Sequence, residues 1–249
     1  MCPSADRPTL VLLHGFLGSA EDWQPVLPAL QRHFHCLALD LPGHGDNRTP
    51  LTRGPGFDEV CQQLEARLPR GRFHLLGYSL GGRIALHLAQ RNPGHLLSLT
   101  LESAHPGLTS QQERQARRQA DARWQRLLQH HSLAEFLRQW YRQPVFADLT
   151  DQARQRMIDA RLGNDPDALG ALYHNTGLGW QQDQRAMLAE LTVPTHYLCG
   201  RADTKFLTLG QELKRQGLVD GLHHFDCGHN VHRACPGPFA DTLIQTLIS

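Results

Sequence analysis

The sequence lacks long apolar runs, an excess of charge of either sign and a leader-like start. No stretch of the 249 residues approaches the roughly 18 apolar residues of a membrane-spanning helix. The start, MCPSADRPTL, contains an acid and lacks the apolar segment of a signal peptide, and Cys2 follows no lipoprotein signal. Lysine plus arginine (25) balance aspartate plus glutamate (24), so nothing directs the chain to nucleic acid or an anionic membrane. We expect a cytoplasmic protein, a monomer or small homo-oligomer, that acts on a small molecule.

Motifs for metal binding and redox chemistry are also missing. The six cysteines include no C-x-x-C pair, and several lie in apolar runs, so we interpret them as reduced, buried thiols. Histidines gather near the C-terminus, at His223, His224, His229 and His232, but without H-E-x-x-H or Cys/His zinc spacing. We therefore expect neither a metal nor an organic cofactor.

Short apolar runs bounded by turn residues predict a set of strands. These runs are Thr9–Leu13, Cys36–Leu39, Phe73–Leu76, Leu96–Leu101, Thr195–Cys199 and His223–Phe225. Helix-like segments separate the early runs, at about residues 20–30, 57–68 and 80–91. Near-continuous apolar strands that alternate with helices are typical of a parallel sheet covered on both faces. The sequence therefore predicts an α/β fold.

The alternation of strands and helices stops after Leu101. From about Leu108 to Leu188 the chain is rich in Arg, Gln, Leu and Ala with helical periodicity, and a strand-like run returns after Pro194. We predict an α/β core of residues 1–107 and 189–249, interrupted by a helical insertion of residues 108–188. Because the insertion leaves after one strand and returns into the next, it should lie over the carboxyl ends of the strands, where open α/β sheets bind ligands.

Gly77-Tyr78-Ser79-Leu80-Gly81 fits G-x-S-x-G, the pattern of a strained strand-to-helix turn that presents a nucleophile. The pattern also arises by chance, but here an apolar strand precedes it and an Ala/Leu-rich helix follows. The glycines are needed where a Cβ would clash. We expect the N–H groups of Leu80 and of Phe16, in the loop after the first strand, to face an oxyanion beside Ser79. His14 of that loop is expected to shape it without transferring protons.

A serine hydroxyl needs a histidine and an acid, in the chain order Ser, acid, His. Asp203 and His229 each come directly after a predicted strand and keep this order. We favour them for that reason. Asp226 is an alternative acid, and His232 is an alternative histidine.

Five stretches, HGFLG, DLPGHG, GYSLGG, GRAD and CGHN, together resemble the α/β-hydrolase superfamily over essentially the whole chain. This resemblance implies a mostly parallel, eight-stranded sheet flanked by helices, a helical cap and a Ser79–His229–Asp203 triad. It leaves the reaction open, because one fold hosts many activities. A carboxylesterase, thioesterase or C–C bond hydrolase would use the same triad with Ser79 as nucleophile, and a non-catalytic binding protein is a second alternative.

Further stretches resemble one family within this fold more specifically. GYSLGGR, HPGL, WYRQPVF, DTKF and GHNVHR are similar to the 2-succinyl-6-hydroxy-2,4-cyclohexadiene-1-carboxylate synthases of menaquinone biosynthesis. The resemblance implies a lyase that eliminates pyruvate from 2-succinyl-5-enolpyruvyl-6-hydroxy-3-cyclohexene-1-carboxylate, with Ser79 as a general base.

A substrate with several carboxylates requires fixed cations, and arginine binds carboxylates through two parallel hydrogen bonds. With the resemblance, this predicts the substrate-binding residues Tyr78, Arg83, Gln111, Arg117, Trp140, Arg161 and Lys205. Arg118 and Arg123 are alternatives to Arg117, and a solvent-exposed arginine is the alternative interpretation of each.

Overall fold

The computed structural model describes residues 7–248. The expectations about Cys2 and about the N-terminal leader lie outside these residues. The five cysteines within them are free thiols. Over the same residues, no helix is both long and apolar enough to span a membrane. No three or more His, Cys, Asp or Glu side chains of this part of the chain gather in a way that would hold a metal ion.

Six parallel strands form one sheet in the order β2-β1-β3-β4-β5-β6. They are β1 (Thr9–Leu13), β2 (His35–Leu39), β3 (Phe73–Tyr78), β4 (Leu96–Glu102), β5 (Thr195–Gly200) and β6 (Gly221–Phe225). Each predicted apolar run forms one of them, which confirms the α/β fold with its parallel sheet. The described residues form six strands where the resemblance implies eight, and after β6 they form helices and no further strand.

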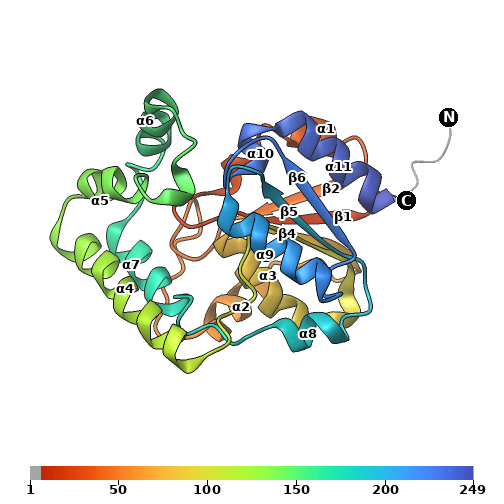
Figure 1. Cartoon of the computed structure of the whole chain (residues 1–249), viewed down its shortest axis with the longest axis horizontal. Helices are drawn as coiled ribbons and strands as arrows, with labels where there is room; N and C mark the ends of the chain where they lie inside the picture. The colour runs from red at the N-terminus through yellow and green to blue at the C-terminus, as the bar shows by residue number, and fades with distance from the viewer. Residues whose placement is uncertain (1–6, 249) are drawn as a thin grey trace.

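Helices cover both faces of the sheet (Figure 1). On one face lie α2 (Asp58–Glu65), α3 (Leu80–Arg91), α8 (Arg185–Glu190) and α9 (Thr204–Arg215), and on the other lie α1 (Leu27–Leu30) and α11 (Pro236–Ile248). Alternate residues of β1 supply the two apolar cores. Val11 and Leu13 pack with the first set of helices, and Leu10 and Leu12 pack with the second.

The helix expected over residues 20–30 is broken, and this prediction was wrong in part. The chain forms a short 3-10 helix, η1 (Ala20–Trp23), and then the single turn of α1. Pro25 lies between them and Pro28 lies inside α1. A proline has no N–H to donate, and its ring clashes with the carbonyl four residues earlier, so a continuous helix cannot form.

Between β4 and α8 the described chain is helical. Its elements are α4 (Gln111–His130), α5 (Leu133–Trp140), η3 (Pro144–Phe146), α6 (Asp151–Asp159) and α7 (Pro166–Asn175). Helices α4 to α7 lie beside the sheet and its flanking helices (Figure 1). Six of their buried side chains, Leu128, Phe136, Leu137, Tyr141, Ile158 and Leu169, pack together in a cluster that also takes in Leu17 from the loop after β1. The cluster joins these helices to the end of the sheet that carries the site.

Candidate active site

Ser79 lies in a strained turn between β3 and α3. Its φ is 50°, a conformation that a residue with a Cβ rarely adopts. The turn is tight on both sides of the serine. A Cβ on Gly77 would lie 2.3 Å from the carbonyl oxygen of Gly81, and one on Gly81 would lie 2.2 Å from that of Leu13. Only glycine fits at these two positions, as the motif requires.

Asp203, His229 and Ser79 form one chain of hydrogen bonds at the carboxyl ends of β5, β6 and β3. His229 Nδ1 lies 2.5 Å from Asp203 Oδ2, and His229 Nε2 lies 3.1 Å from Ser79 Oγ. Asp203 and His229 are both buried, and Asp203 also caps α9 by accepting the N–H of Phe206 at 3.4 Å. This arrangement allows His229 to take the Ser79 proton while Asp203 stabilises the resulting imidazolium.

The two alternatives to these residues have other partners. Asp226 is exposed and forms an ion pair with Arg201 at 2.8 Å. His232 is completely buried, and its Nδ1 lies 2.7 Å from Glu102 Oε2. The geometry therefore favours Asp203 and His229 over Asp226 and His232.

Glu102, the last residue of β4, holds both the serine and the histidine segments. Its carbonyl oxygen accepts the N–H of Ser79 at 2.8 Å. Its carboxylate accepts the N–H groups of Val231 and His232, at 2.7 and 3.1 Å, in addition to its contact with the His232 ring. Glu102 and His232 are completely buried. Glu102 thus fixes the strained turn and the start of α10 (Val231–Ala234), which directly follows the His229 segment.

We expect Glu102→Gln to lower kcat with little change in KM, because the amide NH2 cannot accept a hydrogen bond from His232 and the His229 segment loses its fixed position. A displacement of about 1 Å at a reacting group costs about 10²-fold in rate. Steady-state kinetics measure this split. Asp226→Asn is the matched control, since Asp226 is close to His229 in sequence but makes no contact with Glu102. Unchanged kcat with a lowered melting temperature would limit Glu102 to a purely structural role.

The loop after β1 lies against the serine turn. A Cβ on Gly15 would lie 2.7 Å from Tyr78 Cε1 and 3.6 Å from Ser79 Cβ. Buried His14 ties this loop to the next one, with Nδ1 2.7 Å from the Gly15 carbonyl oxygen and Nε2 accepting the N–H of Leu41 at 3.0 Å. Burial lowers the pKa of His14, which favours a neutral ring that holds the two loops together. Phe16 of this loop and Leu80 at the start of α3 both line the cavity that contains Ser79.

That cavity has a volume of about 100 Å³, and Arg83 lines it as a cation without an acidic partner among the described residues. Arg83 donates its hydrogen bonds to neutral oxygens, from Nε to Gln181 Oε1 at 2.7 Å and from Nη2 to the Thr176 carbonyl. Burial, together with the charge of nearby Arg117, lowers the pKa of Arg83 to about 9, so the guanidinium is still charged at neutral pH. Among residues 7–248, Arg83 has no carboxylate in an ion pair, and a carboxylate ligand would supply one.

Of the three candidate arginines on α4, Arg117 is the one that lines the cavity. Its Nε pairs with Asp121 Oδ1 at 2.7 Å, and the Tyr173 hydroxyl donates to the same oxygen at 2.8 Å. Arg118 instead stacks on Trp180, and Arg123 lies over Trp124. Of the three candidates Arg117 is thus the one that faces the cavity, and substrate binding by it stays a prediction.

The other predicted substrate-binding residues differ in how close they lie to the cavity. Trp140 lines the cavity and packs against Phe16, with ring centroids 5.1 Å apart. Tyr78 is buried beside His229, at 5.4 Å between ring centroids, and Gln111 is exposed at the start of α4. Lys205 does not line the cavity, and desolvation together with the charges of Arg117 and Arg83 lowers its pKa.

Arg161 does not line this cavity. Its Nη2 lies 2.6 Å from both carboxylate oxygens of Asp22, in a pair that is only 7% exposed on each side. Arg233 Nη1 contacts the same carboxylate at 2.7 Å. Arg161 is therefore occupied by an internal partner, and substrate binding by it would require Asp22 to release it.

Sequence reasoning missed several residues at the site. Asp121, Tyr173 and Thr176 line the cavity, while Gln181 and Glu102 orient Arg83 and the triad segments. Asp121 could have been found from the sequence, since it is four residues after Arg117 on a helix, a spacing that favours an ion pair. The others carry no pattern in the sequence that sets them apart.

Comparison with known proteins shows the family of the chain. The family model of the α/β-hydrolase fold matches residues 8–232. The 2-succinyl-6-hydroxy-2,4-cyclohexadiene-1-carboxylate synthase of Pectobacterium atrosepticum is 41% identical, over 98% of this chain and 94% of that protein. The enzyme of the same name from Salmonella typhimurium is 41% identical over 96% of this chain and 94% of its own.

Solved structures show the same relationship. The structure of MenH from S. aureus superposes with a TM-score of 0.89 at 26% identity and covers 97% of this chain and 93% of that one. An enol-lactonase from Burkholderia xenovorans, at 18% identity, has a TM-score of 0.78 over 98% of this chain and 93% of its own, and shares the fold.

Proposed function

The chain belongs to the α/β-hydrolase family and, within it, to the 2-succinyl-6-hydroxy-2,4-cyclohexadiene-1-carboxylate synthases, and we propose that Ser79 is the base of its elimination reaction. Membership makes the chain an enzyme, a lyase built on a hydrolase fold. The substrate in this proposal is 2-succinyl-5-enolpyruvyl-6-hydroxy-3-cyclohexene-1-carboxylate of menaquinone biosynthesis, which loses pyruvate. The observation that carries the proposal is Arg83, a cation beside Ser79 whose hydrogen-bond partners are neutral.

The proton transfer follows from the triad. Ser79 Oγ gives its proton to His229 Nε2, 3.1 Å away, and takes a proton from a ring carbon of the substrate. The electrons of the broken C–H bond form a ring double bond, and the C–O bond to the enolpyruvyl group breaks. The leaving enolate takes up the proton that His229 received, which returns the histidine to its neutral form, and becomes pyruvate. No covalent bond to Ser79 forms at any step.

Charge in the transition state is stabilised by the groups around Ser79. In the proposal, the N–H groups of Phe16 and Leu80 face the oxyanion that develops as the proton leaves. Arg83 binds a substrate carboxylate, and Arg117 is the second candidate because Asp121 already neutralises part of its charge. Trp140 forms an apolar wall.

The remaining assignments stand as parts of the same proposal. Tyr78, Gln111 and Lys205 border the substrate, and Arg161 joins them when Asp22 releases it. Residues 108–188 form the cap, and residues 1–107 and 189–249 form the core. The enzyme works in the cytoplasm without a metal or organic cofactor, as a monomer or small homo-oligomer.

Pyruvate release tests the function. The purified protein is given the enolpyruvyl substrate, with lactate dehydrogenase and NADH reporting pyruvate, and is assayed in parallel with p-nitrophenyl acetate. We expect rapid pyruvate formation and slow ester hydrolysis. Fast ester hydrolysis without pyruvate would instead assign a hydrolase with Ser79 as nucleophile.

A further inference from the structure

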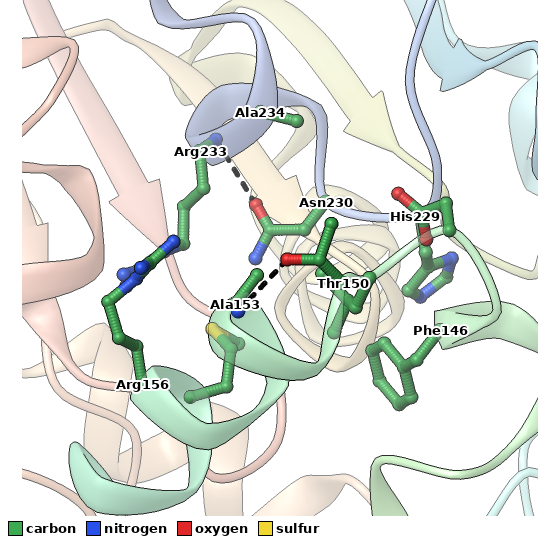
Figure 2. A pocket seen from close by; sticks show the side chains of 11 residues that line it. Phe146, Thr150, Ala153, Arg156, His229, Asn230, Arg233 and Ala234 are labelled. Carbon is green, nitrogen blue, oxygen red and sulfur yellow. Dashed lines mark hydrogen bonds between the residues drawn. The ribbon is translucent and has the colours of Figure 1, made fainter.

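A second cleft, of about 440 Å³, has His229 in its lining (Figure 2). One wall comes from residues of η3 and α6, and the other from the segment that begins at His229. Its volume falls within the range of about 300–1,000 Å³ that is typical of small-molecule sites. The cavity around Ser79, at about 100 Å³, is smaller than that range. A ligand-sized space therefore adjoins the triad histidine without belonging to the cavity of the serine.

Two arginines give this cleft a positive charge. The side chains of Arg156 and Arg233 extend toward one another across it, away from His229 (Figure 2). Arg233 contacts Asp22, but both oxygens of Asp22 are already held by Arg161. Arg156 has no ion-pair partner among residues 7–248. Asp22 is thus shared by Arg161 and Arg233, while Arg156 has no acidic partner in the described part of the chain, so a bound anion would add the negative charge that these arginines lack.

The other lining groups indicate which anion fits. Phe146, Leu149 and Met157 form an apolar wall. Asn230 accepts the N–H of Arg233 with its Oδ1, at 3.3 Å, which leaves its amide NH2 as a donor. The one acid in the lining, Asp148, lies against Gly228, next to His229 in the sequence. Cations at one end, an amide donor and an apolar wall suit a carboxylate with a small carbonyl-bearing body.

We propose that this cleft is a second carboxylate-binding site that takes a small oxo-acid. Arg156 and Arg233 bind the carboxylate, and Asn230 donates to the carbonyl. Under the proposed function two groups have this chemistry, the released pyruvate and the succinyl side chain of the ring. The inference depends on the proposed function only for the choice of these two acids as probes.

Calorimetric titration of the full chain tests the site, with pyruvate as one probe and 4-oxopentanoate, which carries the succinyl ketone and carboxylate, as the other. We expect Arg156→Gln to weaken binding of at least one probe by about tenfold or more, since it removes a charge-assisted hydrogen bond. Arg126→Gln, a change of the same charge on the exposed face of α4, is the matched control and should leave binding unchanged. Ala153→Glu, which puts a carboxylate into the cleft, should prevent binding. Pyruvamide, without the charge, should not bind.

The tighter of the two probes identifies which group the cleft takes. The proposal is overturned if Arg156→Gln binds both acids as wild type does, or if Arg126→Gln weakens them equally. It is also overturned if Arg83→Gln, in the serine cavity, is the change that removes binding. Because titration needs no turnover, it tests the oxo-acid site independently of the proposed lyase reaction. Oxo-acid binding that depends on Arg156 stands even if no pyruvate is produced, and pyruvate production stands even if Arg156 has no effect.

Discussion

Ser79→Ala is expected to lower kcat/KM for pyruvate release by about 10²–10⁴-fold, the usual contribution of a positioned general base. Ser79 Oγ is the group that His229 Nε2 contacts, and alanine leaves no atom there to take the substrate proton. The loss should appear in the rate and not in stability, because alanine accepts the same strained φ of 50° no less readily than serine. The coupled pyruvate assay and a thermal melt measure the two effects.

Ser103→Ala is the matched control for this change. Ser103 also has a positive φ, of 47°, is completely buried and lies next to Glu102, but its hydroxyl has no hydrogen-bond partner among the described residues. We expect it to keep wild-type kinetics. Retention of activity by Ser79→Ala would transfer the role of base to His229, and a serine-bound adduct detected by mass spectrometry during turnover would refute proton abstraction without covalent chemistry.

Asp22→Asn is expected to lower the free energy of unfolding by about 3–5 kcal/mol, the cost of leaving buried charge without its partner. Asp22 is the shared carboxylate of Arg161, just after α6, and of Arg233 in α10. Although burial raises the pKa of Asp22, the charges of Arg161 and Arg233 outweigh this and hold it below its usual value. Urea denaturation followed by tryptophan fluorescence measures the change.

The effect of Asp22→Asn should depend on pH with a definite sign. Because the pKa of Asp22 is lowered on folding, its stabilisation is present above the unfolded value of about 3.9 and is lost as the pH falls through the folded value. The difference between variant and wild type should therefore narrow in acid. Glu21→Gln, one residue earlier and exposed, should change stability by no more than about 0.5 kcal/mol. Equal losses in both variants would refute the role of the Asp22 pair.

The sheet could be predicted from the sequence because each of its strands is a short apolar run. Strands β3 and β5 are buried along their whole length, and most of their residues are apolar, so they stand out from the turns around them. A continuous helix was wrongly predicted over residues 20–30 because the spacing of the apolar residues there suits a helix. Pro25 and Pro28 break it through a missing N–H donor and a ring clash, and neither effect appears in a hydrophobic pattern.

The proximity of Ser79, Asp203 and His229 could also be predicted from the sequence. Each of them follows a strand, and parallel strands end at one edge of the sheet. Substrate contacts were harder, because they depend on how a helix is rotated against its neighbours. Arg117 and Arg118 are adjacent in sequence, yet one faces the cavity and the other stacks on Trp180. Arg161 is paired with Asp22, 139 residues away in the sequence, and a local sequence pattern cannot predict a partner at that separation.

The separate apolar cluster of α4 to α7 has a consequence for how the enzyme can change. The proposed proton-transfer groups lie at the ends of β3, β5 and β6, while Arg117, Trp140 and Tyr173, which line the cavity, lie on helices that pack mainly on one another. Substitutions in α4, α5 and α7, by natural mutation or in a directed library, can therefore change the substrate preference without displacing Ser79, Asp203 and His229. Such modularity makes these helices the place to look for new specificities in this scaffold.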